Sequence, residues 1–170
     1  MSSWRKLALI SCAALVCACG FRLAGYRPLP PLLQMVYIET RLPYTVDEPP
    51  VETALRSRLR RRGATVTGSS QAAESVLLLT DLRETREVLS VGPDGKALEF
   101  ELVTEVAYSV VRNGEILLPE YTQRVTRDYS FNAQQVLAKE AEEARLRRFI
   151  QDELAELILL RLETLLPRTN

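Results

Sequence analysis

The stretch LVTEVAYSVVRNGEILLPEYTQRV, residues 102–125, decides the fold because it predicts a long β-hairpin. Asn113-Gly114 separates two runs rich in β-branched and aromatic residues, and this dipeptide favours the tight turns that join antiparallel strands. Before the turn, residues 96–112 alternate between apolar and polar side chains, as expected of a strand with one buried face. After the turn, residues 116–131 return with a matching alternation.

The turn also predicts the register of the hairpin. If Arg112 pairs with Glu115, the apolar positions of the two strands coincide, which supports the pairing. Pro119 has no backbone N–H to donate, so we expect a bulge or an edge position there. The expected pairs are Val106 with Tyr121, Leu102 with Val125, and Leu98 with Tyr129.

Working outward, the pattern adds three strands and two helices. The strands are predicted at 35–40, 64–67 and 75–91, and Gly92–Gly95 forms the turn after the third. The first helix is expected to begin at Asp47 and to end at Gly63, with Val51, Leu55 and Leu59 as its apolar stripe. The second is expected to begin at Asn132, where Gln135 completes a capping box, and to end before Pro167. Its stripe is Leu137, Ala141, Ala144, Ile150, Leu154, Leu157, Ile158, Leu162 and Leu165.

The order β-α-β-β-β-β-α predicts an α+β fold, a two-layer sandwich with both helices on one face of a mixed, mostly antiparallel sheet. Residues 82–87 are too polar on both faces to belong to the core, so the hairpins are expected to extend beyond the helices. The run KEAEEARLRR, residues 139–148, is typical of a solvated helix face.

The first helix ends in a basic tail that has two explanations. Five arginines crowd its last two turns, where cations complement the helix dipole. Alternatively, they form a binding face for an anionic partner. They are Arg56, Arg58, Arg60, Arg61 and Arg62.

The N-terminus carries the chain's three cysteines, Cys12, Cys17 and Cys19. A basic start, a short apolar run and small residues before Cys19 predict a lipoprotein signal peptide over residues 1–18. The alternatives are Cys12 as the lipid acceptor, or an ordinary signal peptide with incidental cysteines. We therefore expect lipid attachment at Cys19, a proline-rich tether over residues 19–33, and a single α+β domain over residues 34–170.

Composition excludes several functions. The formal net charge is zero, 46% of residues are hydrophobic and 26% are charged, so a nucleic-acid-binding role has no electrostatic footprint. There is no histidine and no recognisable catalytic motif, so we predict neither an enzyme nor a metal or cofactor. Glu99, Glu101 and Glu105 share one strand face. There we expect Arg124 to be a cross-strand ion-pair partner of Glu101 and Glu105 rather than a ligand contact.

Several short motifs, in this order, resemble the LPS-assembly lipoprotein family LptE, also called rare lipoprotein B. The resemblance covers nearly the whole chain after the signal. The matching residues are Cys19-Gly20-Phe21-Arg22-Leu23, Val36-Tyr37-Ile38, the helix end Leu59–Gly63, Arg127-Asp128-Tyr129-Ser130-Phe131-Asn132 and Val136-Leu137-Ala138-Lys139.

The resemblance implies a non-enzymatic outer-membrane lipoprotein that is lipid-anchored on the periplasmic side, with two helices packed on a four-stranded sheet. Gly20 after Cys19, rather than Asp, also points to the outer membrane by resemblance to sorted lipoproteins. The implied partners are the β-barrel LptD, which such proteins plug, and lipopolysaccharide. An envelope scaffold or tether with no lipid ligand is the alternative.

The resemblance also implies two lipopolysaccharide-binding residues. Lys139 matches a basic position at the start of the last helix, and Lys96 is the basic residue nearest to a second position in the Gly92–Lys96 turn, where Pro93 or Asp94 replaces the family's arginine. If the two lysines have no binding role, we expect Lys139 to form an ion pair with Glu143 and Lys96 to be a solvated surface residue.

Overall fold

The computed structural model of the chain describes residues 28–42, 48–131 and 136–167. The expected order of strands and helices is confirmed, with two short 3-10 turns, Pro31–Leu33 and Ser70–Ala72, in addition. The regular elements are β1 (Met35–Arg41), α2 (Pro50–Arg61), β2 (Thr65–Val66), β3 (Ser75–Val91), β4 (Ala97–Arg112), β5 (Glu115–Ser130) and α3 (Val136–Leu165).

The strands form one mixed sheet in the order β2-β1-β3-β4-β5. β1 pairs in parallel with β2 and β3, whereas the long pairs β3–β4 and β4–β5 are antiparallel. The sheet therefore has five strands rather than four. The additional strand is the two-residue β2. The sequence pattern predicted this strand at 64–67, but the four-stranded sheet implied by the family resemblance did not include it.

The β4–β5 turn forms where Asn113-Gly114 predicts it. Both turn residues have positive φ, 51° at Asn113 and 82° at Gly114, and Arg112 pairs with Glu115. Beyond the turn, the predicted register is wrong. Two irregularities in β5 shift the pairing by two residues, because Pro119 interrupts the ladder at the sheet edge. The observed pairs are Tyr108 with Tyr121, Val106 with Gln123, Leu102 with Arg127 and Phe100 with Tyr129.

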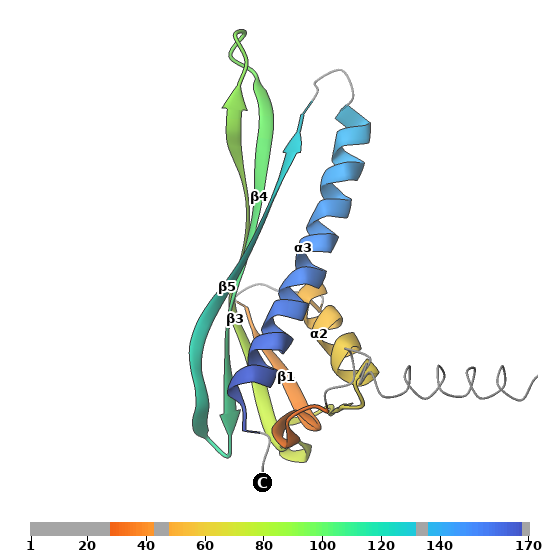
Figure 1. The fold of residues 1–170 in the computed structure, drawn as a ribbon, viewed down its shortest axis with the longest axis vertical. Coiled ribbons are helices and arrows are strands. Elements are labelled where there is room, and N and C mark those ends of the chain that lie inside the picture. Colours follow the sequence, from red (N-terminus) through yellow and green to blue (C-terminus); the bar gives the residue numbers. More distant parts are fainter. Residues whose placement is uncertain (1–27, 43–47, 132–135, 168–170) are drawn as a thin grey trace, which may run out of the picture.

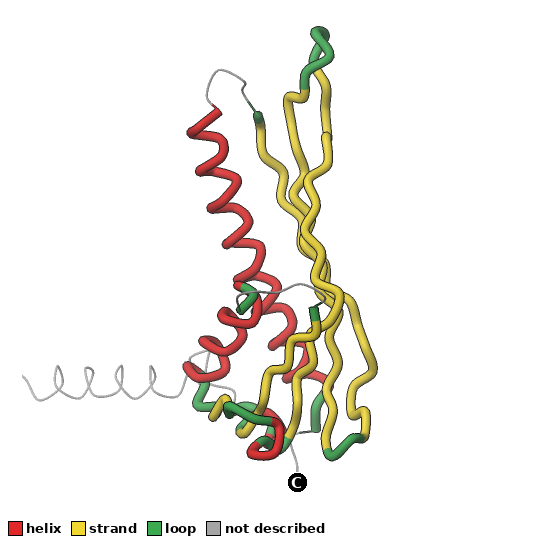
Figure 2. The backbone as a smooth tube through the Cα atoms, turned by 180° about the vertical axis from the view of Figure 1, so that it is seen from behind, coloured by secondary structure: helices red, strands yellow, loops and turns green. Residues whose placement is uncertain are grey.

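β3 also bulges, on the opposite side of β4. Its pairing shifts between Thr80 and Arg83, and Asp81 between them has a φ of 46°. Both bulges lie near Ala107 and Tyr108 of β4, the strand between β3 and β5. Bulges increase local twist, and the strands cross one another at mid-height in Figure 2. The sheet is thereby divided into a lower half and an upper half with different orientations.

Both helices cover the same face of the sheet, as predicted (Figure 1). α3 runs along most of the sheet, whereas α2 packs beside its lower half. The core lies between these layers and is built from alternate strand positions and one stripe of each helix. Its fully buried members include Val36, Leu77, Leu102 and Val106 from the strands, and Leu55, Leu59, Leu154, Ile158 and Leu162 from the helices.

The core also includes residues that we assigned to the tether. Leu29, Leu32 and Leu33 are buried, and the Ser75 hydroxyl donates to the Leu32 carbonyl oxygen at 2.5 Å. The ends of the predicted α3 stripe behave in the opposite way: Leu137 and Leu165 are exposed. The first lies where α3 extends past the apolar core, and an apolar pattern cannot indicate where the covering sheet ends.

α2 begins at Pro50, with Pro49 at its N-cap, so it starts later than predicted; Asp47 lies outside the described residues. Gly63, with a φ of 89°, follows its end in the predicted left-handed conformation. The arginine tail faces α3 in part. Arg58 pairs with Glu156 at 2.6 Å, and Arg62 pairs with Glu163. These contacts join the helices, which favours the structural explanation of the tail.

The other face of the sheet is uncovered (Figure 1). Cross-strand triplets there alternate between charged and neutral rows. Arg124 is 3.3 Å from Glu105 and 3.9 Å from Glu101, so its predicted role as a surface ion-pair partner is confirmed. The rows are Glu87-Glu101-Asp128, Thr85-Val103-Thr126, Arg83-Glu105-Arg124 and Thr80-Ala107-Thr122.

Burial on α3 gives a direct test of this packing. Leu154 is fully buried, whereas Leu160, six residues along the same helix, is 54% exposed. We expect Leu154→Ala to lower the free energy of unfolding by about 2–5 kcal/mol, and the control Leu160→Ala by under about 1 kcal/mol. Urea unfolding of the chain without its signal peptide measures both. Equal losses would contradict the two-layer arrangement.

Candidate functional site

The three predicted site residues lie in different parts of the chain. Cys19, the predicted lipid-attachment residue, lies outside the described residues. Lys96 is in the β3–β4 turn and Lys139 is near the start of α3. Figure 1 shows that this turn and the start of α3 lie at the same end of the molecule, opposite the first described residues and the end of α3.

Lys139 is engaged by its own helix. Its Nζ lies 2.8 Å from Glu142 Oε2, one turn further on, and its side chain is only 15% exposed. The expected pair with Glu143 is therefore wrong, although a pair one residue earlier takes its place. The hydrogen bond from Lys139 lowers the pKa of Glu142, which keeps this carboxylate charged beside the amine.

Lys96 is a surface residue of the turn. Its Nζ lies 3.2 Å from Asp94 Oδ2, and 72% of its side chain is exposed. Gly95 beside it has a φ of 77°, which a turn of this kind requires. Among the described residues the two lysines have separate partners, Asp94 for Lys96 and Glu142 for Lys139, so the structure brings their elements to one end without forming a shared site.

The sequence analysis missed a cluster that connects α3 to the upper half of the sheet. We call it the charged seam; it comprises Glu84, Arg86, Arg127, Tyr129, Glu143, Arg147, Gln151 and Glu153. Glu143 is its centre. Its Oε2 accepts hydrogen bonds from Tyr129 at 2.5 Å and Arg86 at 3.1 Å, and its Oε1 accepts from Arg147 at 2.7 Å.

The seam continues down α3 from this centre. Arg147 also reaches Glu84 at 3.3 Å, and the Gln151 amide donates to the same carboxylate. Arg127 pairs with Glu153 and lies 5.3 Å from the ring centre of Phe149. The upper half of α3 therefore contacts the sheet through charged and polar groups, where the lower half uses aliphatic ones.

Burial and hydrogen bonding oppose each other at Glu143. Burial acts to raise the pKa of this carboxyl, but the hydrogen bonds from Tyr129, Arg147 and Arg86 outweigh it and leave the pKa lowered. Burial raises the pKa of Tyr129, and its bond to the carboxylate adds to the effect. Glu143 is thus the charged acceptor and Tyr129 the neutral donor.

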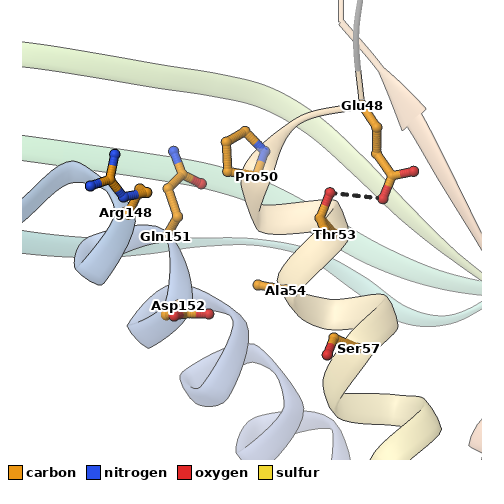
Figure 3. A pocket seen from close by; sticks show the side chains of 8 residues that line it. All are labelled: Glu48, Pro50, Thr53, Ala54, Ser57, Arg148, Gln151 and Asp152. Atoms are coloured by element: carbon orange, nitrogen blue, oxygen red, sulfur yellow. Dashed lines mark hydrogen bonds between the residues drawn. The ribbon is translucent and has the colours of Figure 1, made fainter. Parts of the chain in front are cut away.

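Two hollows adjoin α3. One, of about 270 Å³, lies beside the seam between Arg86, Glu140 and Arg147, but both guanidinium groups already bond Glu143. The other, of about 410 Å³, lies between α2 and α3, and Figure 3 shows Arg148 and Gln151 projecting over it from α3. Across it, the Thr53 hydroxyl donates to Glu48 at 3.0 Å.

The seam left a partial signal in the sequence. The polar run 82–87 indicated a region outside the core, and residues 139–148 were interpreted as a solvated face. That interpretation is wrong for Glu143 and Arg147, which face the sheet, while Glu140 and Arg145 are exposed. A helix face with charges of both signs can be exposed to solvent, or it can pack against a strand that carries the complementary charges. Only the contacts between helix and sheet distinguish these two cases.

The described residues lack two further features. None of the helices there is long and apolar enough to cross a membrane. The same part of the chain contains no group of histidine, cysteine or acidic residues arranged to hold a metal ion.

Comparison with known proteins identifies the family. The family model described as LptE, lipopolysaccharide-assembly, matches residues 33–162, which covers β1 to α3. The chain belongs to the LptE family. The family consists of lipopolysaccharide-assembly lipoproteins and is not one of enzymes, as the sequence predicted.

LptE relatives and solved structures agree with this assignment. The LPS-assembly lipoprotein LptE of Photorhabdus laumondii is 30% identical over 162 residues, covering 92% of this chain and 84% of the relative. The LPS-assembly lipoprotein LptE of Yersinia enterocolitica is 30% identical over 156 residues, covering 91% of this chain and 73% of the relative. Lipoprotein B of Nitrosomonas europaea has a TM-score of 0.70 at 26% identity, covering 85% of this chain and 91% of that structure. The rare lipoprotein B of Shewanella oneidensis shares the fold, with a TM-score of 0.63 at 23% identity. The match covers 76% of this chain and 93% of that structure.

The seam predicts a local effect of neutralising Glu143. Glu143→Gln keeps the side-chain shape but weakens four hydrogen bonds to the carboxylate, one each from Tyr129 and Arg86 and two from Arg147. We expect the free energy of unfolding to fall by about 1–2 kcal/mol, a modest value because Arg86 is half exposed. Hydrogen exchange should increase in the first half of α3 and less in the second. Glu140→Gln, an exposed neighbour, is the control; equal exchange in both variants would contradict the seam.

The lowered pKa of Glu143 predicts a pH dependence. The ordinary pKa of a glutamate is 4.5, and the folded state lowers the pKa of Glu143 below this value. The charged form of Glu143 therefore stabilises the folded state above pH 4.5. This stabilisation is lost as the pH falls below 4.5 and through the lowered pKa. Unfolding free energies measured from pH 7 to pH 3 should therefore converge for the wild type and Glu143→Gln. A constant difference at every pH would refute this assignment.

Proposed function

We propose that this chain is an outer-membrane lipoprotein, anchored on the periplasmic side by acyl chains on Cys19, that plugs the β-barrel LptD and binds lipopolysaccharide. The family match over residues 33–162 carries this proposal, because the relatives it joins are named LPS-assembly lipoproteins. The same match supports a single domain after residue 33, whereas the proposed signal peptide over residues 1–18 and the anchor at Cys19 rest on the sequence pattern.

The shape of the domain supports the plug. A β-barrel of the outer membrane has a polar interior, which requires a polar surface on whatever fills it. The uncovered sheet face meets that requirement, because its rows consist mainly of threonines and charged residues, among which Arg124 pairs with Glu105 and Glu101.

Lys139 and Lys96 are the proposed contacts to lipopolysaccharide phosphates. After the predicted signal peptide they are the only lysines of the chain. Each pairs with a nearby carboxylate, Glu142 or Asp94, so phosphate binding would exchange one charged partner for another. The N-terminal end of α3 adds a favourable dipole near Lys139.

Charge reversal tests this site. We expect Lys139→Asp to weaken lipopolysaccharide binding about tenfold, and Lys96→Asp less, because an exposed lysine gives a weaker contact. Arg60→Asp changes the charge equally on an exposed residue of α2 and should leave the affinity unchanged. Dissociation constants of the purified variants decide. Equal losses in all three would indicate a diffuse charge effect and contradict the assignment.

Affinity purification of the lipidated protein from outer membranes tests the barrel partnership. We expect one large β-barrel protein to be recovered at a fixed ratio and identified by mass spectrometry. Recovery of the folded, lipidated protein without a barrel would refute the plug and favour an envelope scaffold without a lipid ligand.

A further inference from the structure

The β3–β4 hairpin continues past the rest of the sheet. The last residue of β5, Ser130, pairs with Glu99, whereas β3 and β4 pair onward to Val91 and Ala97. The turn closes with a hydrogen bond of 2.8 Å from the Gly92 amide to the Lys96 carbonyl. Figure 1 shows this end projecting beyond α3 and β5. We call residues 88–98 the hairpin tip.

The hairpin tip exposes a concentration of aliphatic side chains. Four large ones are about half exposed: Val88 at 55%, Leu89 at 52%, Val91 at 58% and Leu98 at 48%. An isolated two-stranded hairpin is marginally stable in water, and exposed apolar clusters usually mark a binding surface. The tip therefore has the properties of an element that is covered by something outside the described chain.

The polar groups of the tip are already satisfied, which indicates the chemistry of that cover. Its only charged side chains, Asp94 and Lys96, pair with each other, so its formal charge is zero. The Ser90 hydroxyl donates to Glu99 at 2.8 Å. The tip contains no aromatic residue or arginine, the types that dominate protein–protein contacts. An aliphatic surface without free hydrogen-bonding side chains suits hydrocarbon chains, because these chains contain no hydrogen-bond donors or acceptors.

The tip lies at the far end of the sheet from the first described residues (Figure 1). The bond between Ser75 and Leu32 places the start of the domain at the first residue of β3, and the tip lies at the other end of this 17-residue strand. At about 3.3 Å per residue, β3 spans up to roughly 55 Å, more than the 40–45 Å thickness of a bilayer. The tip also carries Lys96, whose charge complements a phosphate, so we take a phosphorylated lipid as the occupant and not an uncharged hydrocarbon.

We propose that the hairpin tip binds the fatty acyl chains of lipopolysaccharide. The inference rests on the proposed function and adds an apolar contact to the two lysines. Lys96 is part of the tip, so a lipid whose phosphate meets this lysine would have its acyl chains beside Leu89 and Val91. Burial of these side chains then contributes an affinity that depends on acylation, not on charge.

A triple variant tests the tip directly. Val88→Thr, Leu89→Thr and Val91→Thr together remove aliphatic surface and keep β-branched residues in the strand. Leu98 is left in place because it packs against Gly92. We expect the affinity for intact lipopolysaccharide to fall about tenfold or more, with no change for fully deacylated lipopolysaccharide. The control triple Ile116→Thr, Leu160→Gln, Leu165→Gln changes equally exposed positions elsewhere and should bind both as the wild type does.

A fluorescent reporter gives an independent measurement. The only tryptophan of the chain is Trp4, in the predicted signal peptide, so Leu89→Trp places a single tryptophan in the processed protein. We expect its emission to shift to shorter wavelength when intact lipopolysaccharide is added, and not with the deacylated form. Leu160→Trp, on the exposed side of α3, should show no shift with either.

The outcomes separate the two proposals. If the wild type binds intact lipopolysaccharide and the tip triple binds it equally well, the tip proposal is wrong and the proposed function stands. The tip proposal is also wrong if the triple loses affinity for both forms alike, or keeps its affinity but recovers less barrel protein, because the tip would then contact protein. A wild type that binds neither form refutes both proposals.

Discussion

Burial of one face of α3 on the sheet is the contact on which the rest of the structure depends. The helix has 30 residues, and its buried positions from Ile150 to Leu162 meet the inner face of the strands in a single core. α2 is held in turn by α3 through Leu55, Leu59 and the Arg58–Glu156 pair. The short parallel strands β1 and β2 contribute to the lower half only. Without α3, the long antiparallel strands would have an uncovered apolar face.

The same helix changes its mode of contact at mid-length. From Leu154 to its C-terminal end it packs on the sheet mainly by aliphatic burial, and from Glu153 back to its start the charged seam adds polar contacts to the sheet. Two buried polar atoms without a hydrogen-bond partner in the described chain, Thr104 Oγ1 and Gln151 Oε1, lie at this boundary, next to Glu84. Ion pairs that are partly exposed stabilise far less than buried aliphatic contacts. The upper half of the molecule is therefore held more weakly than the lower half, and local opening is expected to begin there.

How far the sequence predicted this structure depended on what each pattern can distinguish. Asn113-Gly114 indicated the turn correctly, because few residues adopt positive φ in succession. Pro119 indicated a bulge, but the pattern did not reveal that the bulges would shift the pairing by two residues. A shift of two leaves every side chain on its original face, so Leu102 faces the core in either register and hydrophobic alternation cannot tell them apart. Strand and helix identities were local properties and could be predicted.

The seam and the two lysines show the opposite limit. Glu143 and Arg147 are bound to residues about 60 positions earlier, and a charged helix run carries no record of such partners. For the lysines, the family resemblance supplied the positions, and the structure added their carboxylate partners and their common end of the molecule.

That common end has a physical consequence for how a lipid could be bound and released. The lower half, where the chain enters and leaves, contains the continuous core and must stay folded for the domain to exist. The upper half contains the hairpin tip, both lysines and the seam, and the seam contacts that hold α3 there are partly exposed and electrostatic. Segments of low local stability can rearrange around a ligand without unfolding the domain. A charged ligand near the seam would also compete with Glu143 for Arg86 and Arg147, so binding and loosening of α3 would be coupled through the same groups.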